Sequence, residues 1–261
     1  MIFRRLAQHL KEQNWTAIAI EFVLLVLGVF LGIQVANWNV ERENLHREAD
    51  FIARLNQDFE RIDARLETSS AKWQMNLTSA NQLLADYKAY KQHGQWPRNK
   101  SAMLFHLNNI TSTANPGPRA ATYEEMLSTA QLGVLRSPRL RDALRDYDTL
   151  AVRGAALHAT LQQRVEPFRP QILAHLQFDT GLTIDALRAT TQSQPGPLRA
   201  DYFNDVDLDS LAADPSTHTM LTMHASTFLD QILVAFRQRE RTEAVLALLA
   251  ENDENGKGGA P

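Results

Sequence analysis

The most apolar part of the chain lies close to its amino end. Residues 17–36 form a run of 20 residues in which Glu21 is the only charged side chain. A helix rises about 1.5 Å per residue, so this run covers roughly 30 Å, the thickness of a bilayer's hydrocarbon core. Trp15 and Trp38 stand at its two ends, where interfacial aromatic residues are common. The pattern predicts a transmembrane helix at 15–38 that contacts the lipid bilayer.

A cleaved signal peptide and a buried core helix are the two alternatives. A signal peptide has a shorter apolar run and small residues before its cleavage site, whereas here Gln34 stands three residues before Asn37. A core helix does not need tryptophan at both ends. We therefore expect an uncleaved anchor, preceded by a short cytoplasmic segment at 1–14.

Basic residues do not settle the orientation of this anchor. Three lie before it and three follow it closely: Arg4, Arg5 and Lys11, then Arg42, Arg47 and Arg54. The number of basic residues is therefore nearly equal on the two sides, and the positive-inside rule does not choose between the orientations. A short amino-terminal flank and a long carboxy-terminal part favour a cytoplasmic amino terminus.

One face of the predicted span carries unusual residues. At 100° per residue, Glu21, Gly28 and Gly32 lie on one stripe, with Leu25 and Val35 beside it. Small residues allow two helices to approach closely in lipid, and a carboxylate on that face can be buried against a partner. The stripe indicates an interface with a second copy or another membrane protein. The alternative is a snorkelling carboxylate and two incidental glycines.

A long helix is expected directly after the span, at 39–92. No glycine or proline occurs between Ile33 and His93. Apolar residues recur every 11 positions in two series: Phe51, Ile62, Trp73 and Leu84, then Leu55, Leu66 and Leu77. This period predicts slight right-handed winding in a bundle. An amphipathic helix packed on its own domain is the alternative.

Turn residues divide the following segment, 93–250, into further helices. Gly94 and Pro97 mark the first break. Thr122 is a candidate N-cap with Glu125 at the capping-box position, and Ser137 is a second candidate, with Pro138 at the first helical position.

The remaining helices are expected at 101–110, from Pro138 to the prolines at 167 and 170, and at 215–250. A polar linker is expected at 192–197 and a disordered tail at 251–261. We find no convincing strand. The predicted fold is all-α: a transmembrane helix that continues into a long helix, followed by an antiparallel helical bundle.

Composition narrows the function only slightly. The chain has 261 residues, a net charge of -3 and no cysteine. It lacks the basic balance typical of nucleic-acid binding, and it can form neither a disulfide nor a thiolate metal site.

No arrangement of residues indicates catalysis, a metal or a cofactor. His218 and His224 are six residues apart, so they point to different sides of a helix. Residues 205–210 resemble the start of a calcium loop but lack its glycine, and a helix cap is the preferred interpretation. We therefore expect that the protein is not an enzyme.

One loop is a candidate ligand site. Asn115, Arg119, Glu124 and Glu125 lie around a Pro-Gly-Pro segment and supply charged and amide groups. The preferred alternative is a capped junction between a loop and a helix.

Two segments resemble an uncharacterised family of bacterial single-pass membrane proteins, a domain of unknown function. The residues that match its span motif are Glu21, Gly28, Gln34, Asn37, Trp38 and Asn39. Those that match its second motif are Thr122, Tyr123, Glu124, Glu125, Leu132, Leu140, Leu144 and Tyr147. Ala130 stands where the family usually has glycine, so a more helical turn is expected there. The resemblance implies no known activity.

From these observations we expect a single-pass protein of the bacterial inner membrane with a periplasmic all-α domain. It would act as a scaffold or interaction module and self-associate or bind a membrane partner. The alternative is a ligand-binding sensor that signals through a membrane partner.

Overall fold

A computed structural model describes residues 15–112, 114–178, 181, 183 and 203–258. The expected cytoplasmic segment at 1–14 and the expected linker at 192–197 lie outside the described residues. The chain divides into two compact units, Met1–Phe51 and Ile52–Pro261. The elements, in order, are α2 (Trp15–His93), α3 (Lys100–Thr111), α4 (Ala121–Ser128), η1 (Leu132–Val134), α5 (Pro138–Val165), η2 (Glu166–Phe168), α6 (Arg169–Ala174), β1 (Leu176–Phe178), β2 (Phe203–Val206), α8 (Leu208–Ala213) and α9 (Thr217–Gly258).

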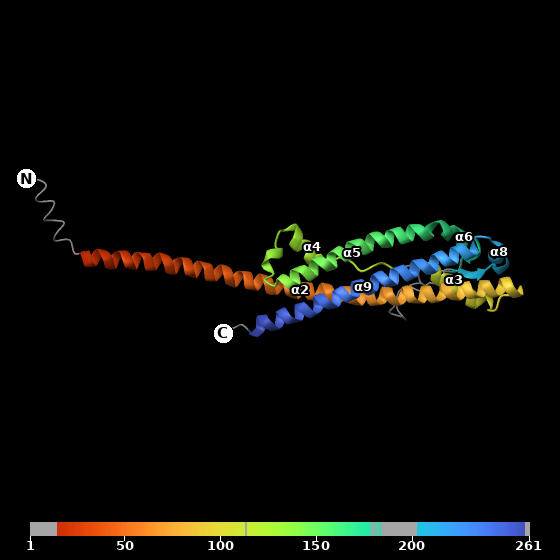
Figure 1. The fold of residues 1–261 in the computed structure, drawn as a ribbon, viewed down its shortest axis with the longest axis horizontal. Helices are drawn as coiled ribbons and strands as arrows, with labels where there is room; N and C mark the ends of the chain where they lie inside the picture. Colours follow the sequence, from red (N-terminus) through yellow and green to blue (C-terminus); the bar gives the residue numbers. More distant parts are fainter. Residues whose placement is uncertain (1–14, 113, 179–180, 182, 184–202, 259–261) are drawn as a thin grey trace, which may run out of the picture. The chain divides into compact units, whose positions relative to one another are not determined.

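The all-α prediction is confirmed, and α2 is one continuous helix from Trp15 to His93. In the second unit α5 and α9 lie alongside α2 (Figure 1). Ion pairs Arg139–Glu251 (4.0 Å) and Arg164–Asp230 (3.3 Å) show that α9 runs antiparallel to α5. α2 and α5 run in the same direction, because the chain returns between them through the loop at 112–120.

A seven-residue repeat, rather than an 11-residue one, governs the packing. The buried side of α2 follows steps of three and four residues: Ile52, Leu55, Phe59, Ile62, Leu66, Ser69, Trp73, Asn76, Ala80, Leu83 and Tyr87. Leu77 and Leu84, which the 11-residue pattern requires, are only half-buried. That prediction is wrong beyond Trp73, because polar and small residues occupy the true buried positions. The heptad pattern is typical of left-handed packing.

The other two long helices repeat the same spacing. In α5 the buried residues are Leu140, Leu144, Tyr147, Ala151, Gly154 and Leu161. In α9 they are Thr217, Leu221, His224, Phe228, Gln231, Ala235, Gln238, Thr242, Val245 and Leu249. Small residues such as Gly154 and Ala235 let α5 and α9 pack most closely, whereas α2 contributes large side chains such as Phe59 and Trp73. Phe59 meets Tyr147 edge-on at 4.9 Å.

The loop at 112–120 crosses the bundle, and polar residues of the helices bind its backbone. Ser69 Oγ donates to the carbonyl of Asn115 (2.8 Å), and Asn76 Nδ2 donates to that of Ser112 (2.8 Å). Tyr147 Oη donates to the carbonyl of Pro118 (2.7 Å). Backbone carbonyls that face the bundle must find donors, which explains why α2 keeps serine and asparagine at buried positions.

The helix starts were predicted with mixed success. Ser137 caps α5 by accepting from the backbone N–H of Leu140 (3.2 Å), as predicted. The prediction for Thr122 is wrong: α4 begins at Ala121 after Ala120, without a side-chain cap. Asp58 of α2 instead accepts the backbone N–H of Thr122 (2.8 Å). A residue distant in sequence thus replaces the local cap.

The end of α4 also differs from expectation. Ala130 has φ of 54°, in the left-handed region. The N–H of Gln131 donates to the carbonyl of Met126 (2.8 Å), and that of Ala130 donates to the carbonyl of Leu127 (3.3 Å), the bonds of a Schellman cap. The turn is therefore not more helical, although alanine replaces the glycine of the resembling family.

Two further expectations need correction. An antiparallel pair of short strands, β1 and β2, joins Leu176 to Val206 in a region for which we expected no strand. The helix α9 continues to Gly258, so 251–258 is helical where a disordered tail was expected. The pair is held by α3 and α6, which contact β2 and β1, so tertiary contacts stabilise strands too short to be recognised in the sequence.

Candidate functional site

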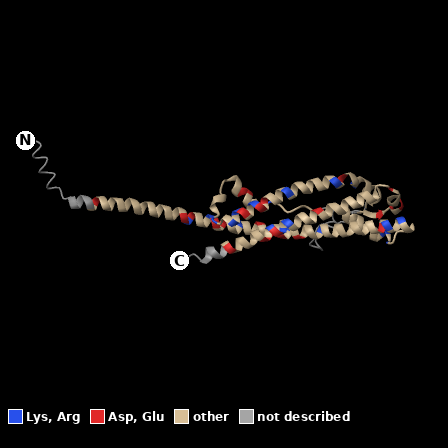
Figure 2. Cartoon of the chain, in the orientation of Figure 1, with Lys and Arg blue, Asp and Glu red and all other residues tan. Residues whose placement is uncertain are grey.

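The described part of the first unit is a helix, and its apolar side chains from Ile20 to Leu45 are exposed. Every side chain from Ile20 to Val40 is exposed, including Leu25 (64 %) and Val35 (56 %). Figure 2 shows no charged side chain along residues 22–40. The helix is long and apolar enough to cross a membrane. Trp38 is exposed as well, and Trp15 lies in the first turn of α2.

No described residue packs against the two glycines of this helix. A Cβ added at Gly28 or Gly32 would meet no atom within 4 Å. Packing in the described chain therefore does not require glycine at either position. Glu21 is exposed on the same stripe, and no hydrogen bond or ion pair joins it to a described residue.

In the candidate ligand loop, the charged side chains form ion pairs with other residues of the same domain. Arg119 binds Asp148 through two hydrogen bonds (2.6 and 2.9 Å) and also pairs with Glu124. The hydrogen bond to Asp148 raises the pKa of Arg119. Glu125 points elsewhere and pairs with Arg54 of α2 (3.1 Å for Nη1 to Oε1).

The Arg54 hydrogen bond lowers the pKa of the Glu125 carboxyl. Asn115 contributes its backbone carbonyl to Ser69. The structure thus brings Arg119 and Glu124 together and directs Glu125 to a different partner. These contacts join the loop, α4, α5 and α2, as a structural junction does.

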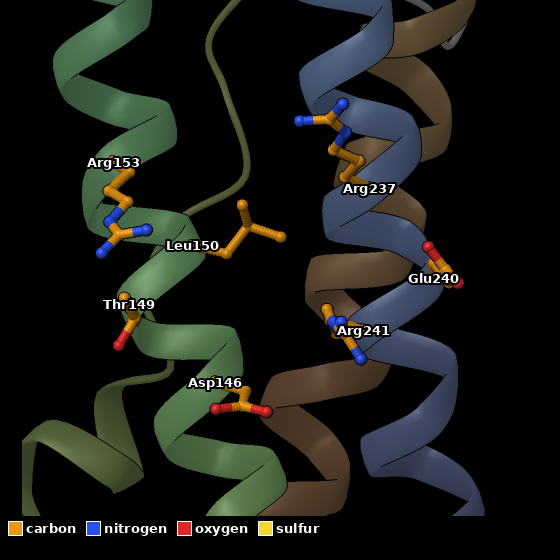
Figure 3. A pocket seen from close by; sticks show the side chains of 7 residues that line it. All are labelled: Asp146, Thr149, Leu150, Arg153, Arg237, Glu240 and Arg241. Carbon is orange, nitrogen blue, oxygen red and sulfur yellow. The ribbon is translucent and has the colours of Figure 1, made fainter.

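A groove that sequence patterns did not indicate lies between α5 and α9 (Figure 3). It has a volume of about 450 Å³ and is lined by Asp146, Thr149, Leu150, Arg153, Arg237, Glu240 and Arg241. The first four come from α5 and the other three from α9. Their spacing of three or four residues on each helix was visible in the sequence. The pairing of these two helices was not.

The candidate calcium-like segment serves as a helix start. Asp207 caps α8 by accepting from the backbone N–H of Ser210 (3.0 Å), as preferred from the sequence. Among the described residues no group of three or more histidine or acidic side chains has the arrangement of a metal site.

In comparisons with known proteins, no protein-family model, curated protein or solved structure matches the chain. The function is therefore argued from the residues themselves.

Proposed function

We propose that this protein is a single-pass membrane protein whose helical domain acts as a scaffold or interaction module, and that it self-associates through its span. The observation that carries the proposal is the exposed apolar helix with a glycine stripe that no described residue covers. Exposing so many large apolar side chains to water is unfavourable, and lipid removes that cost. Glycine at positions 28 and 32 would allow the backbones of two such helices to approach closely in the membrane.

The localisation follows from the same argument together with the family resemblance. The span anchors the protein in a bacterial inner membrane, with residues 1–14 in the cytoplasm and the helical domain in the periplasm. A reporter enzyme fused to the carboxy terminus tests this orientation. Activity of a reporter that works only in the cytoplasm would contradict it.

Cysteine crosslinking in native membranes tests the self-association. The chain has no cysteine, so Leu25→Cys introduces a single thiol beside the glycine stripe. Oxidation is expected to give a disulfide-linked dimer. Val26→Cys, about 160° away from Gly28 on the helix, is the matched control and is expected to give little dimer.

Adding Gly28→Ile to Leu25→Cys is expected to reduce the dimer at least fivefold, because the side chain separates the two backbones. Equal crosslinking at positions 25 and 26, or no effect of isoleucine, would show that this face is not the contact. Crosslinks only to a different protein would identify a membrane partner instead of a second copy.

The groove between α5 and α9 favours a second candidate function, a sensor that binds a ligand and signals through a membrane partner. Its volume lies within the range of about 300–1,000 Å³ typical of small-molecule sites. A ligand that binds the helical domain and changes crosslinking at Leu25→Cys would support this alternative over a purely structural scaffold.

A further inference from the structure

The groove between α5 and α9 has an unusual charge arrangement. Three arginines line it, Arg153 on α5 and Arg237 and Arg241 on α9. Figure 3 shows Arg153 and Arg237 at one end of the groove, Asp146 and Arg241 at the other, and Glu240 on the side of α9 away from α5. One arginine from each helix therefore lies at the end of the groove that is away from Asp146.

These three arginines differ from their neighbours on the same helices. Arg164 pairs with Asp230 across the two helices, and Arg239 pairs with Asp63 of α2 (3.2 Å). Among the residues that the structure describes, the guanidinium groups of Arg153, Arg237 and Arg241 form no hydrogen bond or ion pair with another side chain.

Repulsion among the three arginines lowers the stability of the folded domain. Like charges four residues apart on a helix, such as Arg237 and Arg241, repel each other and destabilise the helix. Arg153 adds a third positive charge from the facing helix. An anion in the groove would remove this repulsion.

We propose that the groove binds a small molecule bearing a phosphate group, which lies at the end of the groove between Arg153 and Arg237. Guanidinium groups bind phosphate oxygens through paired hydrogen bonds, and two of them match a group with two negative charges and several oxygens better than a single carboxylate. The Thr149 hydroxyl and the Asp146 carboxylate lie in the same lining and suit hydroxyl groups on the remainder of the ligand. Leu150 provides an apolar surface between them.

This site belongs entirely to the helical domain, so it does not depend on self-association of the span. The test uses the full-length protein in detergent and isothermal titration calorimetry. Glycerol 3-phosphate is the probe, and glycerol and succinate are the matched controls for the phosphate group. Binding of glycerol 3-phosphate is expected, with at least tenfold weaker binding of succinate and none of glycerol.

Two variants locate the site. Arg153→Gln and Arg237→Gln are each expected to weaken binding of glycerol 3-phosphate at least tenfold. Both side chains are exposed, so folding should be preserved, which circular dichroism checks. Arg145→Gln is the control, because Arg145 is an exposed arginine of α5 that pairs with Asp142 (3.1 Å) outside the groove.

Three results would overturn the proposal. The first is the absence of binding to the unmodified protein. The second is equal weakening by Arg145→Gln and Arg153→Gln, which indicates attraction to general positive charge. The third is binding of succinate as strong as that of glycerol 3-phosphate, which contradicts a phosphate site.

Discussion

Single residues in this chain take roles that depend on contacts far away in sequence. Asp58 of α2 binds the backbone N–H of Thr122 and thereby starts α4, although the local sequence suggested that Thr122 itself was the cap. The side chain of Asp58 is nearly buried, and it also binds Arg61 (2.8 Å). Capping from another helix links formation of α4 to folding of the bundle.

Ala130 is the clearest single site for improving stability. Its φ of 54° costs a residue with a Cβ about 1–2 kcal/mol, whereas glycine adopts this conformation freely. Part of the gain is lost because glycine is more flexible in the unfolded chain. Ala130→Gly is therefore expected to stabilise the protein by about 0.5–1 kcal/mol, measured as a higher midpoint of thermal unfolding.

The control makes the same chemical change in a regular helix. Ala155 is exposed in the middle of α5, and Ala155→Gly is expected to lower stability by about 0.5–1 kcal/mol. Destabilisation by both substitutions would show that the left-handed conformation of Ala130 is not strained.

At the scale of elements, the loop at 112–120 is held between helices by close packing. A Cβ at Gly117 would lie 2.7 Å from Cδ2 of Leu66, whose side chain is fully buried. Oε1 of Gln238 in α9 would lie 3.4 Å from the same Cβ. The loop therefore contacts α2 and α9 at a point where only glycine fits.

Gly117→Ala is expected to destabilise the protein by about 1–3 kcal/mol, because Leu66 or the loop must shift to make room. Chemical denaturation of the full-length protein measures the change. Gly133→Ala is the matched control, since a Cβ there meets no atom within 4 Å, and it is expected to have little effect. A similar loss in both variants would contradict tight packing of the loop.

The heptad pattern also explains which elements could be predicted. Long runs without glycine or proline indicated α2, and the Ser-Pro pair indicated the start of α5. The repeat itself was hidden, because Ser69, Asn76 and Ala80 occupy buried positions that are normally apolar. The reason for two of these residues appears only when the crossing loop is seen, since Ser69 and Asn76 bind its carbonyls.

At the scale of the whole molecule, one buried and two half-buried histidines predict a response of stability to pH. Desolvation by burial lowers the pKa of His106, His158 and His224 from the ordinary value of 6.5. The unfolded chain therefore binds protons at a higher pH than the folded chain does. The stability of the folded protein is intact above about pH 6.5 and falls as the pH drops below that value.

The midpoint of thermal unfolding is accordingly expected to fall between pH 7.5 and pH 5.5, a range above the ordinary pKa of carboxylates. His224→Gln is expected to reduce this fall, because it removes the most buried of the three imidazoles. His93→Gln changes an exposed histidine and serves as the control. An equal pH response in all three proteins would mean that His224 does not contribute.

The sequence by itself determined the features that depend on local composition and on solvent. These are the apolar span, its glycine face, the helical class and the cap at Ser137, because hydrophobic length, helical periodicity and neighbouring hydrogen bonds are all encoded in contiguous residues. Only the tertiary structure decided the cap from Asp58, the path of the loop at 112–120 and the arginine groove. Each of these joins residues from separate helices, and their meeting depends on how three heptad faces pack together.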